Sequence, residues 1–137
     1  MDKPREAGGK MIDEKDREIW VGKNRLYLGE DNIVYFFIVG EHDENIAIAC
    51  GEAFLKLINM VEGKGNALGD INKTGKQSLE ARKIWKKISE NEKVGKLALI
   101  GMHPVARVLA SFLIGTTKKK DIRFFKTKEE ALAWLKE

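Results

Sequence analysis

The spacing of the hydrophobic positions changes along the chain, and these changes mark the expected elements. After residue 18, three short apolar segments are separated by turn-forming residues, which predicts strands at 19–22, 25–29 and 33–39. The third segment, IVYFFIV, is apolar at every position, a pattern typical of a strand that is buried on both faces. Three later segments also favour strands, at 66–71, 96–101 and 122–125.

Between the later strands the apolar residues recur every three or four positions, which indicates amphipathic helices. The first helix is expected to begin after Asp43, a good N-cap, and to end at Gly63, which suits a left-handed C-cap. The second has two candidate starts, because Thr74 and Gln77 have the spacing of a capping box and Ser78 offers another N-cap.

The last two helices carry similar boundary signals. Pro104 suits the first turn of a third helix, which is expected to end near Gly115. Thr127 and Glu130 have the spacing of a capping box for a C-terminal helix. The predicted order is therefore three strands, followed by four helices that alternate with three further strands.

This order predicts an α/β fold. Strands joined by short turns are expected to pair antiparallel, whereas strands that alternate with helices pair parallel through right-handed crossovers. The sequence therefore predicts one domain over residues 18–137, with a mixed sheet, antiparallel at its start and then parallel, flanked by four helices. Residues 1–17 contain Pro4, a glycine pair and alternating charges, and are expected to form a flexible tail.

Charge is distributed unevenly along the 137 residues. Residues 1–62 carry eight basic and 13 acidic side chains, whereas residues 63–128 carry 16 basic and five acidic ones. A basic half is suited to bind an acidic partner, an anionic ligand or nucleic acid. Alternatively, its lysines simply face solvent on the helices and one loop. Nucleic-acid binding is disfavoured, because the basic stretches lack interleaved exposed aromatic residues.

Few residues are available for catalysis or metal binding. The single cysteine, Cys50, excludes an internal disulfide and lies on an apolar helix stripe, where it is expected to act as a small hydrophobe. Two histidines leave little material for a metal centre, and neither phosphate-binding glycine motif is present. No apolar run is long enough to cross a membrane, and the N-terminus lacks a signal core. We therefore expect a cytoplasmic protein without enzymatic activity or cofactor.

Two positions are candidate functional residues. His103 follows a predicted strand and precedes Pro104, so it is either a general base or anion contact at the strand end, or an exposed loop histidine whose protonation the helix dipole disfavours. Ser78 is either an ordinary first-turn serine or a phosphorylation site, where the helix dipole, Lys76 and Arg82 would stabilise the added charge.

Three segments carry a resemblance to a known family: GDINKTGKQSLEARKIW, KLALIGMHPVARVLASFL and DIRFFKTKEEALAWLKE. Over residues 18–137 the chain resembles the STAS-type domains called SpoIIAA-like, after the sporulation anti-sigma-factor antagonist. The resemblance implies a non-enzymatic binding module. In the bacterial antagonists, a D-S-S-G-type loop opens the second helix, and its serine is phosphorylated by a partner anti-sigma kinase. Ser78 is the matching serine here, although the preceding acidic residue and the following glycine are absent.

The resemblance implies two functions of different kinds. The first is a regulatory protein-interaction module resembling anti-sigma-factor antagonists, with an unknown protein partner. Its expected binding surface comprises Asp70, Thr74, Lys76, Ser78, Arg82 and His103. The second is a small-molecule or lipid-binding module with an apolar pocket between sheet and helices, because SpoIIAA-like proteins also resemble the lipid-exchanging Sec14 group in fold. Pairing of such domains through sheet edges or helices would give a homodimer.

Overall fold

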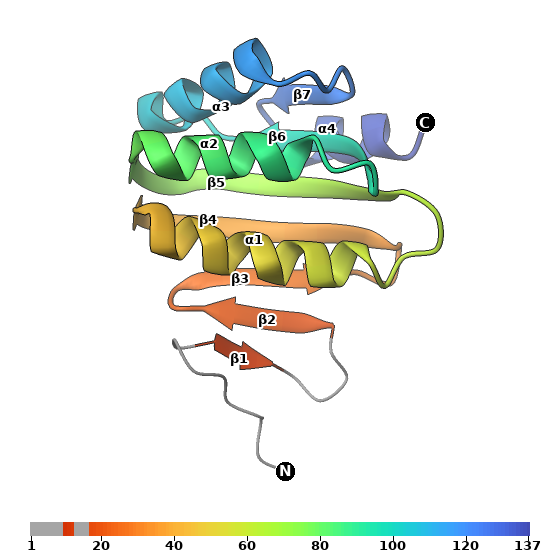
Figure 1. The fold of residues 1–137 in the computed structure, drawn as a ribbon. Helices are drawn as coiled ribbons and strands as arrows, with labels where there is room; N and C mark the ends of the chain where they lie inside the picture. The colour runs from red at the N-terminus through yellow and green to blue at the C-terminus, as the bar shows by residue number, and fades with distance from the viewer. Residues whose placement is uncertain (1–9, 13–16) are drawn as a thin grey trace.

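Seven strands form one sheet whose spatial order is the order of the chain, β1 to β7. The computed structural model describes residues 10–12 and 17–137 (Figure 1). Its strands are β1 (Lys10–Ile12), β2 (Glu18–Val21), β3 (Asn24–Leu28), β4 (Ile33–His42), β5 (Gly65–Gln77), β6 (Val94–Ile100) and β7 (Ile122–Phe125). Its helices are α1 (Glu44–Ile58), α2 (Leu79–Ser89), α3 (Pro104–Thr116) and α4 (Lys128–Leu135).

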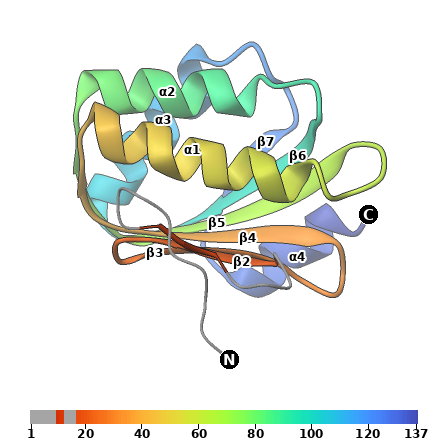
Figure 2. The same ribbon diagram turned by 60° about the horizontal axis from the view of Figure 1, so that its bottom comes forward.

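The strand directions confirm the predicted mixed sheet. Strands β1 to β4 pair antiparallel, and β4 to β7 pair parallel. Because each right-handed crossover steps to the next strand in the same direction, the connecting helices α1, α2 and α3 all lie on one face, and α4 lies on the other (Figure 2). The strand order never reverses, so the sheet lacks the switch point at which doubly wound α/β sheets bind ligands.

The main core lies between the sheet and the three helices on its first face. Phe36 of β4 stacks on Trp85 of α2 at 5.7 Å between ring centroids and meets Phe54 of α1 edge-on at 5.3 Å. Gly69 of β5 gives the Phe36 ring its room, since a Cβ at this glycine would lie 2.3 Å from Phe36 Cζ. Cys50 is fully buried in this core, and burial raises the pKa of its thiol to about 12.

A second, smaller core lies under α4. Trp134 and Leu135 of α4 pack against Tyr35 of β4, Leu68 of β5 and Ile100 of β6. The Tyr35 hydroxyl donates a hydrogen bond to Asp31 Oδ2 at 2.6 Å, which helps to hold the turn before β4. The C-terminal helix thus closes part of the face that the crossovers leave open.

The structure differs from the sequence-based expectation at several element boundaries. Strand β4 extends to His42 rather than to residue 39, and α1 ends at Ile58 rather than at Gly63. Lys10–Ile12, in the predicted tail, forms β1 and pairs with β2 through Lys10↔Val21 and Ile12↔Ile19. A strand of three residues is too short to show an alternating hydrophobic pattern in the sequence. Residues 1–9 and 13–16 lie outside the described part of the chain, so the domain boundary at residue 18 stays a prediction. Strand β5 runs to Gln77 rather than residue 71, so Thr74 and Gln77 lie in a strand and Ser78 is the N-cap of α2.

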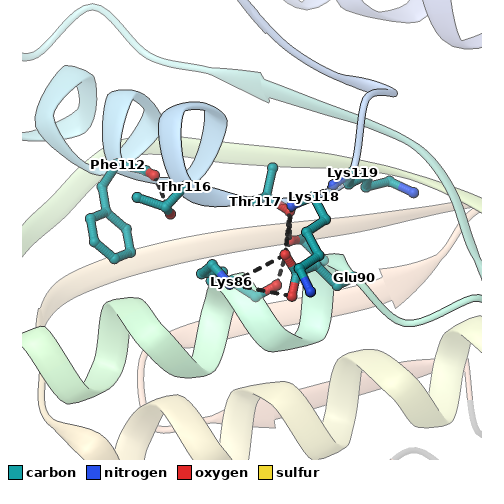
Figure 3. Close-up of polar contacts among 8 residues, drawn as sticks. Lys86, Glu90, Phe112, Thr116, Thr117, Lys118 and Lys119 are labelled. Carbon is teal, nitrogen blue, oxygen red and sulfur yellow. Dashed lines mark hydrogen bonds and ion pairs between the residues drawn. The ribbon is translucent and has the colours of Figure 1, made fainter.

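A carboxylate ties the C-terminal end of α2 to the loop that follows α3 (Figure 3). Glu90, the C-cap residue of α2, accepts hydrogen bonds from the backbone N–H of Lys118 at 2.6 Å and from Thr117 Oγ1 at 3.3 Å. Its Oε2 also lies 3.3 Å from Lys86 Nζ. The N–H of Lys118, followed by the contacts with Lys86 and Thr117, lowers the pKa of the Glu90 carboxyl.

We expect Glu90→Gln to lower stability at neutral pH and to have progressively less effect in acid. A carboxyl whose pKa is lowered by folding stabilises the protein above its unfolded-state pKa, and that contribution is lost as pH falls through the folded-state pKa. Urea midpoints of the wild type and Glu90→Gln, measured from pH 7 to pH 3, test this. Glu92→Gln, a change at an exposed carboxylate two residues away, is the control. A difference independent of pH would contradict the assignment.

We expect Gly69→Ala to destabilise the domain by about 1–3 kcal/mol, because its methyl group would enter the space of the Phe36 ring. Gly115→Ala is the matched control. Gly115 lies exposed near the end of α3, a Cβ there meets nothing within 4 Å, and alanine in a helix stabilises by up to about 1 kcal/mol. Urea unfolding of both variants measures the two effects, and similar free energies for the two would disprove the packing argument.

Candidate functional site

Strands β4 and β5 continue together beyond the end of β6. Their pairing extends to His42↔Gln77, whereas the last pair between β5 and β6 is Asp70↔Ile100. On the side away from β4, the final residues of β5 therefore run alongside the start of α3, where β6 no longer pairs with them. The N–H of Met102, just before α3, donates to Asn72 Oδ1 at 2.9 Å across this junction. This two-stranded extension forms one edge of the molecule, where α1, α2 and α3 begin (Figure 1).

A buried polar pair closes the core at this edge. His42 is 2% exposed, and its Nε2 lies 3.0 Å from Oδ1 of Asn24, which is 4% exposed. Because Asn24 Oδ1 also accepts from the N–H of Val39 and its Nδ2 donates to Val21, His42 must donate through Nε2. The other ring nitrogen, Nδ1, is buried without a partner among the described residues. Burial lowers the pKa of His42 to about 4, against smaller opposing effects of Asp43 and of the Val39 backbone.

The neighbouring strand end carries a second buried polar pair. Gln77 Nε2 donates to Thr74 Oγ1 at 2.9 Å, and that hydroxyl donates to the carbonyl of Gly75 at 3.0 Å. Gln77 is 6% exposed, and its Oε1 is buried without a partner among the described residues. The hydroxyl of Thr74 therefore holds the side chain of Gln77 through its nitrogen and leaves the carbonyl oxygen without a hydrogen bond.

The Arg82 side chain lines the same surface hollow as Gln77. Its guanidinium carbon lies 5.0 Å from the centroid of the Phe112 ring on α3, so α3 supports it by a cation–π contact. Its Nε is buried without a partner, and Arg82 forms no ion pair within residues 10–12 and 17–137. Arg82 is thus a half-buried cation whose charge no carboxylate of the described residues neutralises.

The hollow lined by Gln77 and Arg82 has a volume of about 280 Å³, and we call it the α2–α3 cleft. It is lined by Lys76, Gln77, Arg82, Val105, Val108 and Leu109. Lys76 also borders a second hollow with Ser78 on the side of α1, together with Glu41, His42, Asp43 and Ile46. The start of α2 therefore lies between two depressions, one basic and apolar, the other containing two carboxylates.

Ser78 has a defined structural role at this edge. Its Oγ accepts a hydrogen bond from the N–H of Ala81 at 3.0 Å, the contact expected of an N-cap. Its own N–H donates to the carbonyl of His42 at 3.0 Å, which joins the start of α2 to the end of β4. The side chain is half-buried, so it lies at the surface and not in the core.

The structure brings together three of the six predicted site residues. Lys76, Ser78 and Arg82 surround the first turn of α2, whereas Thr74 is 4% exposed and holds Gln77 from the inside.

Asp70 and His103 lie apart from this cluster. Asp70 binds Asn72 and borders a hollow with Phe37 and Lys73. His103 is exposed and caps α3, with Nδ1 accepting from the N–H of Val105 at 3.1 Å. It is therefore the N-cap of α3 and does not line the cleft.

Sequence reasoning missed Gln77 as a site residue, along with the aliphatic wall from α3. The capping-box spacing predicts a helix start for Gln77, whereas its position in the cleft depends on the pairing of β5 with β4. The apolar stripe of α3 predicts that Val108 is buried, but the structure leaves it 61% exposed, so the sequence carries no signal for the wall. No group of three potential metal ligands occurs within the described residues, and no helix there is long and apolar enough to cross a membrane.

The antiparallel start, the parallel strands in chain order and the helices on both faces define a SpoIIAA-like fold. It is shared by an uncharacterized protein from the DUF3478 family of Shewanella loihica PV-4, at 20% identity and a TM-score of 0.61, over 80% of this chain and 90% of that one. It is also shared by an anti-sigma factor antagonist from Mycobacterium paratuberculosis, at 16% identity and a TM-score of 0.62. That match covers 84% of this chain and 96% of the antagonist chain.

Residues 27–137 match the family described as Domain of unknown function (DUF7793), and the chain belongs to this family. No curated protein matches the chain. The predicted resemblance to SpoIIAA-like domains is confirmed at the level of the fold.

We expect the imidazole of His42 to titrate near pH 4. Its folded-state pKa lies below the unfolded value of about 6.5, so the unfolded chain takes up the proton first and stability declines as pH falls from about 6.5 towards 4. The NMR shift of the ring protons in His103→Gln, which retains His42 as its single histidine, measures this value. A titration at or above pH 6.5 would show that His42 is not held neutral by burial.

Proposed function

We propose that this protein is a non-enzymatic regulatory module that binds another protein through the surface around the start of α2. The observation that carries this proposal is the grouping of Lys76, Ser78 and Arg82 beside an open cleft. Leu79, the first residue of α2, adds an apolar side chain that is 45% exposed. A surface that combines unpaired cations with exposed apolar side chains is suited to a protein partner.

Ser78 is suited to regulate this surface by charge. A helix N-cap position tolerates a carboxylate or phosphate because the first-turn N–H groups and the helix dipole favour negative charge. Lys76 adds a nearby cation, while Glu41 and Asp43 border the hollow on the side of α1. Negative charge added at Ser78 would therefore alter the potential of the docking surface without removing the cap of α2.

The fold gives this proposal a precedent, since one structural neighbour is an anti-sigma factor antagonist. Ser78, which the family resemblance matches to the phosphorylated serine of the antagonists, is the N-cap of α2. We extend the regulatory role to this chain because the same edge carries the cleft and its unpaired charge. His103 accepts the N–H of Val105, a structural role that supports the expectation of no catalytic centre at this edge.

The alternative of a lipid-binding pocket receives less support from the packing. The cavity between the sheet and helices α1 to α3 measures about 20 Å³, space for about one water molecule. Small-molecule sites usually occupy about 300–1,000 Å³. Phe36, Trp85 and Leu109 fill the region where a lipid chain would lie. A lipid would have to separate α2 or α3 from the sheet.

We expect Ser78→Asp to change partner binding while leaving stability within about 1 kcal/mol of the wild type, because aspartate is itself a good N-cap. The immobilised protein would capture partners from a lysate of the organism that encodes it, with quantification by mass spectrometry. Leu79→Glu, which places charge on the same exposed surface, should have the same effect.

Met60→Glu is the matched control, because Met60 is 43% exposed and lies beyond the C-terminal end of α1, away from the start of α2. Proteins captured equally by the wild type and Met60→Glu, but lost with Ser78→Asp and Leu79→Glu, would support the docking surface. Capture that is unchanged by both substitutions at the start of α2 would overturn it.

A further inference from the structure

The α2–α3 cleft has a chemical character that identifies what a partner must present to it. Its lining combines two cationic side chains, Lys76 and Arg82, with three aliphatic ones, Val105, Val108 and Leu109, and no carboxylate of the described residues contributes to it. Val108 is 61% exposed, so the aliphatic wall is open to a binding partner. An occupant therefore meets positive charge on one side and apolar surface on the other.

Two buried polar atoms of this lining lack partners among the described residues. Gln77 Oε1 is an acceptor, because its Nε2 is already used by Thr74, and Arg82 Nε–H is a donor. Polar groups that are buried without a hydrogen bond are costly, so native proteins retain few of them. Both atoms belong to side chains that line the same cleft, which points to an occupant that supplies one acceptor and one donor.

The chemistry of Arg82 indicates which acceptor fits. Its guanidinium carbon lies 5.0 Å from the centroid of the Phe112 ring, and the N–H groups of a guanidinium donate in its plane, from its edges. A carboxylate suits such an edge, because its two oxygens match the parallel N–H groups of arginine. Lys76 supplies a second positive charge at the rim of the cleft.

We propose that the α2–α3 cleft binds an acidic side chain from a peptide segment of the partner protein. The carboxylate pairs with Arg82 and Lys76, a backbone N–H of the segment donates to Gln77 Oε1, and a neighbouring aliphatic side chain packs on Val105 and Val108. This inference rests on the docking surface proposed above and specifies the chemistry of its partner. A free phosphate dianion fits less well, because it has no N–H for Gln77 and leaves the aliphatic wall exposed.

The test uses two small peptides that differ in one charge. N-acetyl-leucyl-glutamyl amide carries the carboxylate, the amide N–H and the aliphatic side chain, and N-acetyl-leucyl-glutaminyl amide is its neutral isostere. Each is titrated into the full-length, isotope-labelled protein, with the Arg82 Nε–H and Val108 methyl NMR signals as readouts. We expect saturable shifts with the glutamyl peptide and an affinity at least about tenfold weaker for the glutaminyl peptide, the loss expected for a charged hydrogen bond.

Substitutions in the protein test the same contact from the other side. Arg82→Gln should weaken binding of the glutamyl peptide at least about tenfold, whereas Lys83→Gln, which removes the same charge from an exposed neighbour, should leave it within twofold. Val108→Glu is a second variant at an exposed position, where the fold tolerates the change. Its carboxylate should compete for Arg82, so Val108→Glu should weaken peptide binding at least about tenfold more than Val108→Gln, which removes the same aliphatic contact without adding a charge.

The outcomes separate this inference from the docking proposal. Partner capture that is lost with Ser78→Asp, combined with equal binding of the two peptides, would overturn the acidic anchor and leave the docking surface in place. Discrimination between the peptides, together with partner capture that Val108→Glu reduces more strongly than Val108→Gln, would support the inference. Partner capture that is unaffected by both Arg82→Gln and Val108→Glu would overturn it.

Discussion

The parallel pairing of β4 with β5 is the constraint on which the rest of the molecule depends. These two strands lie at the centre of the sheet and join its antiparallel half to its parallel half. Their register places the Phe36 ring over Gly69, where a Cβ would collide with it. Because the pairing continues to His42 and Gln77, it also determines where α1 and α2 begin. The main core thus packs along this strand pair, and the candidate site lies at its carboxyl end.

The extension of this strand pair holds most of the buried polar groups of the described residues. Four of the five buried polar residues of the described chain, Asn24, His42, Thr74 and Gln77, lie in or beside it. Each buried polar atom left without a partner costs about 1–3 kcal/mol, and three of the four such atoms belong to His42, Gln77 and Arg82. Unused hydrogen-bonding capacity is therefore concentrated at the edge where the helices begin, which is where a binding partner could satisfy it.

The one-directional winding of the sheet explains why the site is a cleft between helices. With α1, α2 and α3 on the same face, their N-terminal ends lie side by side at one edge. No reversal of strand order opens a crevice in the sheet itself, so the side chains of α2 and α3 and the end of β5 have to form the depression. The short helix α4 covers the opposite face and takes no part in it.

The sequence by itself determined the class of fold, the predicted strand directions and the four helices, because hydrophobic periodicity and capping residues such as Asp43, Thr127 and Pro104 act locally. It also indicated Ser78 as a helix start. It did not determine the length of β5, since the polar segment NKTGKQ has no strand pattern and becomes a strand only because the extended edge of β4 pairs with it. The positions of Gln77, Arg82 and Val108 around one cleft were likewise decided by the tertiary structure. Contacts among β5, α2 and α3 bring together residues far apart in the chain, and such long-range pairing leaves no periodic signal in any one segment.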